Sequence, residues 1–196
     1  MNHDTYYKRS KQLDIYPHLR DSVELLPSEL PKIAIDMGCG SGRNALFLVE
    51  YGYRVHAFDH HPLAIERVQE SGKAHFGTSL FTCHARFDQF EYPSASLITA
   101  CMSLFFCHPG VFPTVWKKLT QSLSSGGIFC GHFMGPEDTW ARDESLHLTI
   151  HTSSMLSSLF ADDYHLIALQ EKAEAGTTLM GKNKDWHTYS VILQKR

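Results

Sequence analysis

The residues with the clearest chemical potential are an acid and three glycines that follow one another closely. Asp36 ends a short apolar run that begins at Ile33, and Gly38, Gly40 and Gly42 come after it at alternate positions. Glycines let the chain turn sharply and leave backbone N–H groups open to a ligand. A helix that begins after such a loop adds unpaired N–H donors and a partial positive charge. The segment therefore predicts a strand, a ligand-binding loop and a helix N-terminus, in that order.

A second acid, Asp59, ends the apolar segment that begins at Arg54, and it lies 59 − 36 = 23 residues after Asp36. In a Rossmann-type βαβ unit, the acid at the tip of the second strand binds ribose hydroxyls. Asp36 would repel the pyrophosphate of a dinucleotide and would favour a ligand that bears an ammonium group. S-adenosylmethionine has an ammonium and a ribose but no phosphate, so the two acids favour it over NAD.

The segment D-M-G-C-G-S-G-R-N-A-L-F-L, followed by Gly52-Tyr53-Arg54-Val55, resembles the class I S-adenosylmethionine-dependent methyltransferases. Within them it is most similar to the small bacterial tellurite-resistance branch, over about residues 30–135. The resemblance implies an α/β fold, with a Rossmann-like, doubly wound, mostly parallel seven-stranded sheet and an antiparallel C-terminal hairpin. It also implies an enzyme that transfers a methyl group to a small-molecule acceptor and leaves S-adenosyl-L-homocysteine.

The family pattern places the cofactor contacts in the glycine loop and just after the second, third and fourth strands. In this sequence those positions are Asp36, Met37, Gly38, Cys39, Gly40, Gly42, Arg43, Asn44, Asp59, His60, Arg86, Phe87, Cys101, Met102 and Ser103. Family members usually carry an acid near the adenine amino group, at the position that Arg86 occupies here. Asp88 lies close by, and the sequence leaves open which of the two contacts the adenine.

The acceptor is expected to contact the leading segment and the connections after the fourth and fifth strands. The residues predicted there are Tyr6, Tyr7, Phe106, His108 and Trp140. The sequence shows no clear nucleophile–base pair, so no catalytic residue is assigned. A general base is needed only when the acceptor must lose a proton. A soft nucleophile such as a thiol or a metalloid oxyanion fits that pattern.

Two other functions compete with this interpretation. One is an NAD-binding Rossmann oxidoreductase, which Asp36 and the predicted terminal hairpin disfavour. The other is a non-catalytic module that only binds S-adenosylmethionine. Nothing in the sequence excludes the second, because the cofactor motif is separate from the acceptor residues.

Apolar patterns predict the elements that position these residues. The expected strands are Ile33–Ile35, Arg54–Asp59, Leu80–Ala85, Ser96–Met102, Ile128–Phe133, Tyr164–Leu169 and His187–Leu193, the last two joined by a charged linker over 171–185. Helices are expected over 44–51, over 62–71, from Val111 to Leu119, and after Thr152, an N-cap residue. We expect one methyltransferase domain over residues 1–196, with a helical cap segment over residues 1–30.

The composition bounds the environment of the protein. Of 196 residues, 43% are hydrophobic, which suffices for a full core, and the formal net charge of −3 argues against a general nucleic-acid binder. The apolar stretches are too short to span a membrane, and residues 1–10 are too polar for a signal peptide. Five scattered cysteines (39, 83, 101, 107 and 130) predict mostly buried free thiols in a reducing cytoplasm. The oligomeric state cannot be inferred.

The histidines predict no metal site. His147 and His151 have the i, i+4 spacing of a metal pair, but no third ligand lies near them in the sequence. His132 falls inside the fifth strand and is expected to be a core residue.

Overall fold

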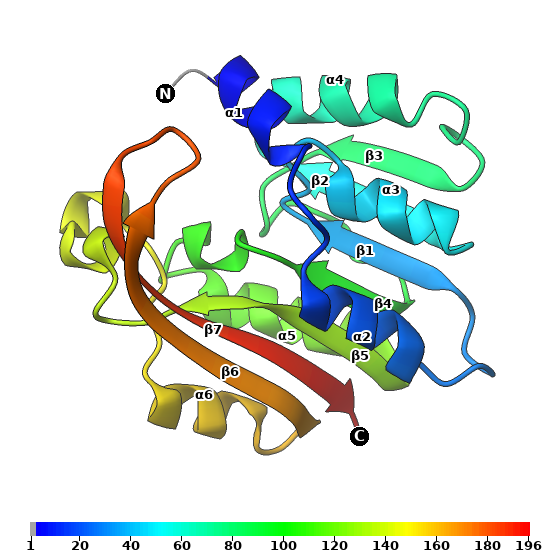
Figure 1. Cartoon of the computed structure of the whole chain (residues 1–196). Helices are drawn as coiled ribbons and strands as arrows, with labels where there is room; N and C mark the ends of the chain where they lie inside the picture. The colour runs from blue at the N-terminus through cyan, green and yellow to red at the C-terminus, as the bar shows by residue number, and fades with distance from the viewer. Residues whose placement is uncertain (1–2) are drawn as a thin grey trace.

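The computed structural model describes residues 3–196, and a mixed seven-stranded sheet runs through them in the order β3-β2-β1-β4-β5-β7-β6 (Figure 1). The first five strands pair in parallel, and β7 runs antiparallel to both β5 and β6. The predicted fold class is therefore confirmed. The strands are β1 (Ile33–Met37), β2 (Arg54–Asp59), β3 (Leu80–His84), β4 (Ala95–Ala100), β5 (Leu123–Met134), β6 (Tyr164–Thr177) and β7 (Asn183–Lys195).

Helices connect the strands and begin at residues that suit a helix start. A proline lies in the first turn of three of them, as Pro17, Pro62 and Pro113, where its missing N–H costs nothing. Thr152 caps another, since its hydroxyl accepts from the N–H of Met155 at 3.2 Å. The α-helices are α1 (His3–Ser10), α2 (Pro17–Leu25), α3 (Arg43–Glu50), α4 (Pro62–Ser71), α5 (Phe112–Ser122) and α6 (Ser153–Phe160). Short 3₁₀ turns are η1 (Leu104–Phe106), η2 (Thr139–Arg142) and η3 (Glu144–Leu146).

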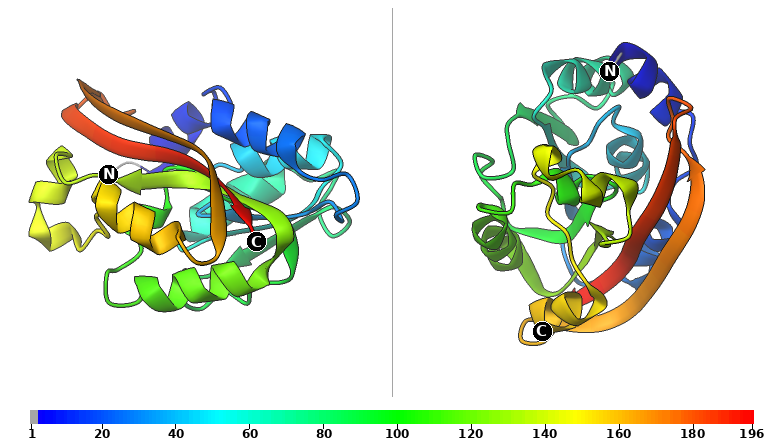
Figure 2. Two further views of the ribbon diagram at one scale, coloured as in Figure 1. Left: turned by 90° about the horizontal axis from the view of Figure 1, so that it is seen from below. Right: turned by 90° about the vertical axis from the view of Figure 1, so that its left-hand side faces the viewer.

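Helices cover both faces of the sheet (Figure 2). Successive strand residues point to opposite faces, so neighbours such as Ala34 and Ile35 belong to two different apolar clusters. One cluster includes α5 and α6 residues such as Trp116 and Phe160, and the other includes residues of α2, α3 and α4. Burial on both faces explains why every residue of β4 is buried.

The order of the strands reverses between β1 and β4, which pair directly although they are distant in the chain. In open α/β sheets, ligands bind beyond the carboxyl ends of the strands at such a point. Asp36 lies near the end of β1, and Cys101 follows β4 directly. The fold therefore brings the glycine loop and the segment after β4 together at one edge of the sheet.

Three local expectations need correction. The segment 171–185 is not a linker, because β6 and β7 pair continuously down to Thr177 and Asn183. Hydrogen bonds between the two strands, together with the Lys172–Glu174 ion pair at 2.6 Å, stabilise this polar stretch. It lacks the alternating apolar residues that would have predicted a strand. The fifth strand begins at Leu123, ahead of the predicted glycine turn. The fourth ends at Ala100, because Met102 takes a positive φ of 55°.

The N-terminal helix and the C-terminal hairpin meet at one end of the molecule, as the right-hand view of Figure 2 shows. The guanidinium of Arg9 on α1 donates to the carbonyl oxygen of Leu179, in the turn between β6 and β7, at 2.6 Å. Asp4 of α1 forms an ion pair with Arg67 of α4. Among the described residues, no helix is both long enough and apolar enough to cross a membrane.

Candidate functional site

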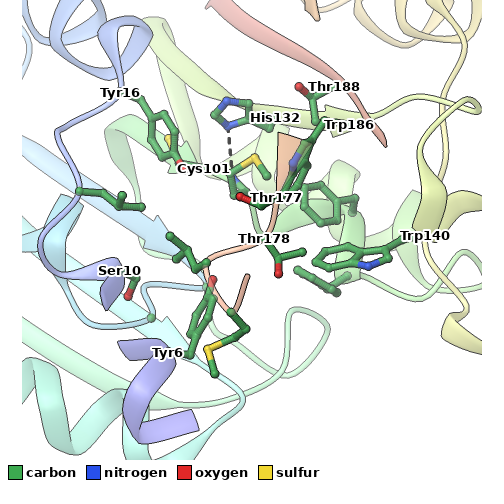
Figure 3. Close-up of a pocket in the computed structure, with 18 of the residues that line it drawn as sticks. Tyr6, Ser10, Tyr16, Cys101, His132, Trp140, Thr177, Thr178, Trp186 and Thr188 are labelled. Carbon is green, nitrogen blue, oxygen red and sulfur yellow. Dashed lines mark hydrogen bonds between the residues drawn. The ribbon is translucent and has the colours of Figure 1, made fainter. Parts of the chain in front are cut away.

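A cavity of about 870 Å³ lies at the predicted edge of the sheet, between the glycine loop, the segment after β4, the α1–α2 segment and the β6–β7 hairpin (Figure 3). Most of the lining surface is apolar, and aromatic side chains from several elements contribute to it. A volume of this size suits a small-molecule or cofactor site. The lining residues that belong to the glycine loop and the segment after β4 are Gly38, Cys39, Gly40, Ser41, Arg43, Asn44, Cys101, Met102, Phe105 and Phe106.

The glycine loop needs its glycines for backbone geometry and for space. Gly38, Gly40 and Gly42 all have positive φ, at 70°, 54° and 82°. A Cβ on Gly38 would lie only 2.6 Å from the Cβ of Ser103, whereas one on Gly40 would have only Tyr7 near it, at 3.9 Å. Gly38 is therefore required by packing against the protein, and Gly40 leaves its space open to a ligand.

Asp59 binds the glycine loop directly. Its carboxylate accepts from the backbone N–H of Gly40 at 3.0 Å and from that of His61 at 2.9 Å. Burial raises the pKa of Asp59, but the hydrogen bonds from His60 and from the two backbone groups outweigh it, so the pKa lies below its ordinary value. The acid at the tip of β2 is therefore ionised and lies beside the loop, as a ribose-binding acid requires.

Asp36 is buried beneath the loop, with 1% of its surface exposed. Burial raises its pKa to about 7, although the nearby Arg43 guanidinium opposes the rise. One carboxylate oxygen of Asp36 and one terminal nitrogen of Arg43 are buried without a hydrogen-bond partner. Such groups are rare in folded proteins and call for an explanation. An acid and a base that each keep one unpartnered atom at the same loop match the two charges of a zwitterionic amino-acid group.

The segment after β4 forms another wall of the cavity. Met102 has a positive φ, which is uncommon for a non-glycine residue, and its N–H donates to Nδ1 of His132 at 3.2 Å. Cys101 Sγ lies 3.4 Å from Nε2 of His18 and 3.2 Å from the hydroxyl of Thr99. Burial lowers the pKa of His18 to about 4 and that of His132 well below its usual value. Both imidazoles are therefore neutral at pH 7.

The far end of the cavity is lined by Trp140 and Trp186 together with Phe106. The Lys184 ammonium lies 4.4 Å from the Trp140 ring centroid and 4.1 Å from that of Trp186, and it forms a buried ion pair with Asp138. These contacts fix the two indoles relative to each other. The end wall is thus aromatic and built from both η2 and β7.

The structure brings half of the predicted contact residues to the cavity and places the others elsewhere. Tyr7, Met37 and Ser103 are buried behind the lining, and Phe87 packs on Phe58. Arg86 is largely exposed beside Asp88, and His60 is exposed beside Asp59. The predicted residues that line the cavity are Tyr6, Gly38, Cys39, Gly40, Arg43, Asn44, Cys101, Met102, Phe106 and Trp140, whereas Tyr7, Asp36, Met37, Gly42, Asp59, His60, Arg86, Phe87, Ser103 and His108 do not.

His108 was predicted to contact the acceptor, but it does not line the cavity. Its Nδ1 accepts from the N–H of Gly110, and its ring lies 5.4 Å from that of His147. The turn after η1 directs this side chain to solvent instead of the cavity. His151, the other histidine of the i, i+4 pair, is buried against Phe112 and Phe133.

Several lining residues were not expected from the sequence. Tyr16 and His132 line the cavity, although His132 was expected to be a simple core residue. The largest group of missed residues belongs to the β6–β7 hairpin. Most of them lie in the segment 171–185, which the sequence predicted to be a linker and not part of two paired strands. The missed residues are Ser10, Leu13, Tyr16, Ser41, Phe105, His132, Leu146, Lys172, Glu174, Thr177, Thr178, Leu179, Met180, Lys182, Asn183, Trp186 and Thr188.

Comparison with known proteins decides the family. A family model described as "Tellurite resistance protein TehB" matches residues 1–130. The chain belongs to the TehB family. The predicted resemblance is thereby confirmed, and S-adenosylmethionine as the cofactor agrees with it.

Curated relatives of this TehB-family chain match it over a similar number of residues. A probable S-adenosyl-L-methionine-dependent methyltransferase TehB from Haemophilus influenzae (strain 10810) is 25% identical over 127 residues, which cover 63% of this chain and 42% of the relative. Hemagglutinin 1 from Eikenella corrodens is 37% identical over 130 residues, which cover 63% of this chain and 40% of that protein. The chain thus spans about two fifths of the length of these relatives.

Solved structures confirm the fold of the TehB-family chain. TehB from Haemophilus influenzae superposes with a TM-score of 0.76 at 17% identity, covering 99% of this chain and 67% of that one. The N-methyltransferase NodS from Bradyrhizobium japonicum WM9, in complex with S-adenosyl-L-homocysteine, gives a TM-score of 0.69 at 14% identity and covers 100% and 99%. At these identities the likeness concerns the fold alone.

Proposed function

We propose that this chain is an S-adenosylmethionine-dependent methyltransferase that acts on a small-molecule acceptor. The observation that supports this most is the pair of buried, unpartnered side-chain atoms, one on Asp36 and one on Arg43, beside the glycine loop. Their opposite charges complement the ammonium and carboxylate of the amino-acid end of the cofactor. A dinucleotide would instead place its pyrophosphate near the Asp36 carboxylate.

The remaining cofactor contacts follow from the loop. Asp59 holds the ribose hydroxyls while its other contacts fix Gly40, and the backbone at Gly40 approaches the ligand. Phe87 lies near the loop, since a Cβ on Gly38 would be 3.7 Å from its ring. We assign the adenine to the side of the loop that carries His60, Arg86 and Phe87. The methionine part lies along Cys101, Met102 and Ser103.

The protein supplies position and a dry environment, whereas the sulfonium supplies an activated methyl group. Holding donor and acceptor in line contributes up to about 7–11 kcal/mol in favourable cases. The α1 helix and the β6–β7 hairpin both line the cavity and are joined by the Arg9–Leu179 hydrogen bond, so together they reduce its exposure to water. We therefore regard residues 1–30 as a cap segment of one methyltransferase domain over residues 1–196.

For the acceptor, we propose a soft nucleophile such as a thiol or a metalloid oxyanion. Among the cavity-lining residues that the structure describes, the imidazole of His132 is neutral and already accepts from Met102. The Nδ1 lone pair of His132 is therefore engaged by Met102, and taking a proton there would break that hydrogen bond. An acceptor that is already anionic, or that ionises easily in water, needs no such base.

The function is tested by binding and turnover. Titration calorimetry should show binding of S-adenosylhomocysteine and no measurable binding of NAD. Turnover is then followed as S-adenosylhomocysteine release with a panel of thiols, tellurite, selenite and amines. Binding without turnover on any acceptor would support the non-catalytic module. NAD binding in preference to S-adenosylhomocysteine would overturn the proposal.

A further inference from the structure

Three side chains distant in sequence converge at one wall of the cavity. His18 comes from α2, Cys101 follows β4, and His132 belongs to β5. One donor atom from each lies within 4.8 Å of the donor atoms of the other two. Figure 3 shows Cys101 and His132 on the same side of the cavity, beside Tyr16. No sequence motif indicates this cluster, because 83 residues separate the first two members.

The spacing of these donors approaches that of a tetrahedral metal site. Ligand bonds of about 2.0–2.3 Å place tetrahedral donors roughly 3.3–3.8 Å apart. Cys101 Sγ and His18 Nε2 already lie 3.4 Å apart, and the two imidazole rings are 4.5 Å apart and nearly perpendicular, at 84°. Small side-chain rotations would bring the third donor to the same distance.

The donor set selects the kind of ion. Two imidazoles and a thiolate suit borderline-soft divalent ions such as Zn²⁺, whereas Mg²⁺ and Ca²⁺ prefer oxygen ligands. We propose that His18, Cys101 and His132 bind a divalent transition-metal ion of this kind, with a fourth coordination position open to the cavity. Cys101 and His132 both line the cavity, so the open position faces the space where an acceptor would lie.

Binding of the ion changes the protonation state of Cys101 and one hydrogen bond of His132. The thiol of Cys101 loses its proton to solvent on becoming a ligand. The N–H of Met102 points at Nδ1 of His132, which marks that nitrogen as the one with the lone pair. An ion at Nδ1 replaces this contact. Met102 has the strained backbone described above, and such strain concentrates at functional sites.

A chemical consequence rests on the proposed function, whereas the metal site itself does not. A thiol acceptor at the open position loses its proton to solvent and is held as a thiolate. Its sulfur forms a bond to the methyl carbon, and the carbon–sulfur bond of the sulfonium breaks, with the electron pair going to the departing sulfur. The products are S-adenosylhomocysteine and a neutral thioether, which is a weaker ligand than the thiolate and leaves.

Cobalt(II) provides the test, because a thiolate ligand gives an intense charge-transfer absorption that imidazole ligands lack. The protein, stripped of metal with a chelator, should bind one Co²⁺ and show this band, and Zn²⁺ should displace it. In Cys101→Ser the band should be lost, with circular dichroism confirming the fold. In His18→Gln the affinity for Co²⁺ should fall at least tenfold while S-adenosylhomocysteine still binds. Cys83→Ser, which alters an exposed cysteine, is the matched control and should behave as wild type.

Other outcomes would overturn the inference. Absence of a thiolate band in the wild type, its survival in Cys101→Ser, or its loss in Cys83→Ser each excludes this site. A Co²⁺ spectrum that does not change when 2-mercaptoethanol is added would exclude the open position. S-adenosylhomocysteine binding is measured separately in the metal-free protein, so failure of the metal site and failure of the proposed cofactor are distinguished.

Discussion

The raised pKa of Asp36 predicts that cofactor affinity depends on pH. In the unliganded protein burial raises this pKa to about 7. At pH 6 only about one tenth of the carboxyl groups are then ionised, and at pH 8 about nine tenths are. If the ammonium of S-adenosylhomocysteine binds the ionised form, affinity should rise about tenfold from pH 6 to pH 8. That rise corresponds to about 1.4 kcal/mol.

The matched variant is Asp36→Asn. An asparagine keeps an oxygen that can accept from the backbone N–H of Ala45, which donates to the carboxyl group in the wild type. It removes the charge and the titration. Calorimetry at pH 6, 7 and 8 should therefore show weaker binding in the variant and a smaller slope against pH. Because His60 has a raised pKa beside Asp59, the difference between the two proteins isolates the part due to Asp36.

Calorimetry in buffers of different ionisation enthalpy adds a second readout. Near pH 7 the wild type should release about half a proton on binding, and the variant should release less. The advantage of S-adenosylhomocysteine over methylthioadenosine, which lacks the amino-acid end, should also shrink in the variant. Equal slopes and an equal advantage in both proteins would refute the assignment of the ammonium to Asp36.

The same pKa shift has a consequence for folding. Between pH 4 and pH 7 the native state holds a proton on Asp36 that the unfolded state loses, so this residue lowers stability as pH rises through that window. Asp36→Asn should accordingly raise the melting temperature at pH 8 and have little effect at pH 4. Thermal unfolding monitored by circular dichroism measures the difference.

The remaining predictions concern three positions. Asp59→Ala should weaken S-adenosylhomocysteine binding at least tenfold, since it removes charge-assisted hydrogen bonds worth about 1.5–3 kcal/mol each; unchanged affinity by calorimetry would remove Asp59 from the site. Gly40→Val should fold but no longer bind S-adenosylhomocysteine. The control Gly77→Val, at a positive φ of 78° with open space around it, should keep binding. Equal affinities in the two variants would show that the glycine loop does not bind the cofactor. Lys184→Met should destabilise the protein by about 3–5 kcal/mol, because it leaves the buried Asp138 carboxylate without its ion-pair partner. Urea unfolding measures the free energy of unfolding, and a loss smaller than this would show that water solvates Asp138 in the variant.

The sequence predicts the first half of the fold well because local patterns determine it. The run Ile33–Ile35, the alternate glycines and Asp59 specify a strand, loop and strand tip whose chemistry is contained in a short segment. The structure places Asp59 within hydrogen-bonding distance of the glycine loop, through its contact with the N–H of Gly40. Little long-range information is needed for that part.

The rest of the cavity could not be predicted, because it depends on pairing between distant segments. The tip of the β6–β7 hairpin is polar and lacks an apolar period, yet its register with β7 brings Thr177 opposite Asn183. His132 lies in a strand pattern that reads equally as core. Only the approach of α2 reveals that His18 lies beside Cys101. Contacts of this kind come from tertiary packing, which local periodicity does not encode.

The contact between Arg9 and Leu179 has a consequence for how the cavity forms. It joins residues 170 positions apart, and it is a single exposed hydrogen bond. Closing so long a loop costs entropy that only the completed sheet can offset. The contact between α1 and the turn of the β6–β7 hairpin therefore depends on the rest of the fold being in place. The shape of the cavity thus depends on segments from both ends of the chain, whereas the groups that we assign to the cofactor lie in the glycine loop and at the neighbouring strand ends.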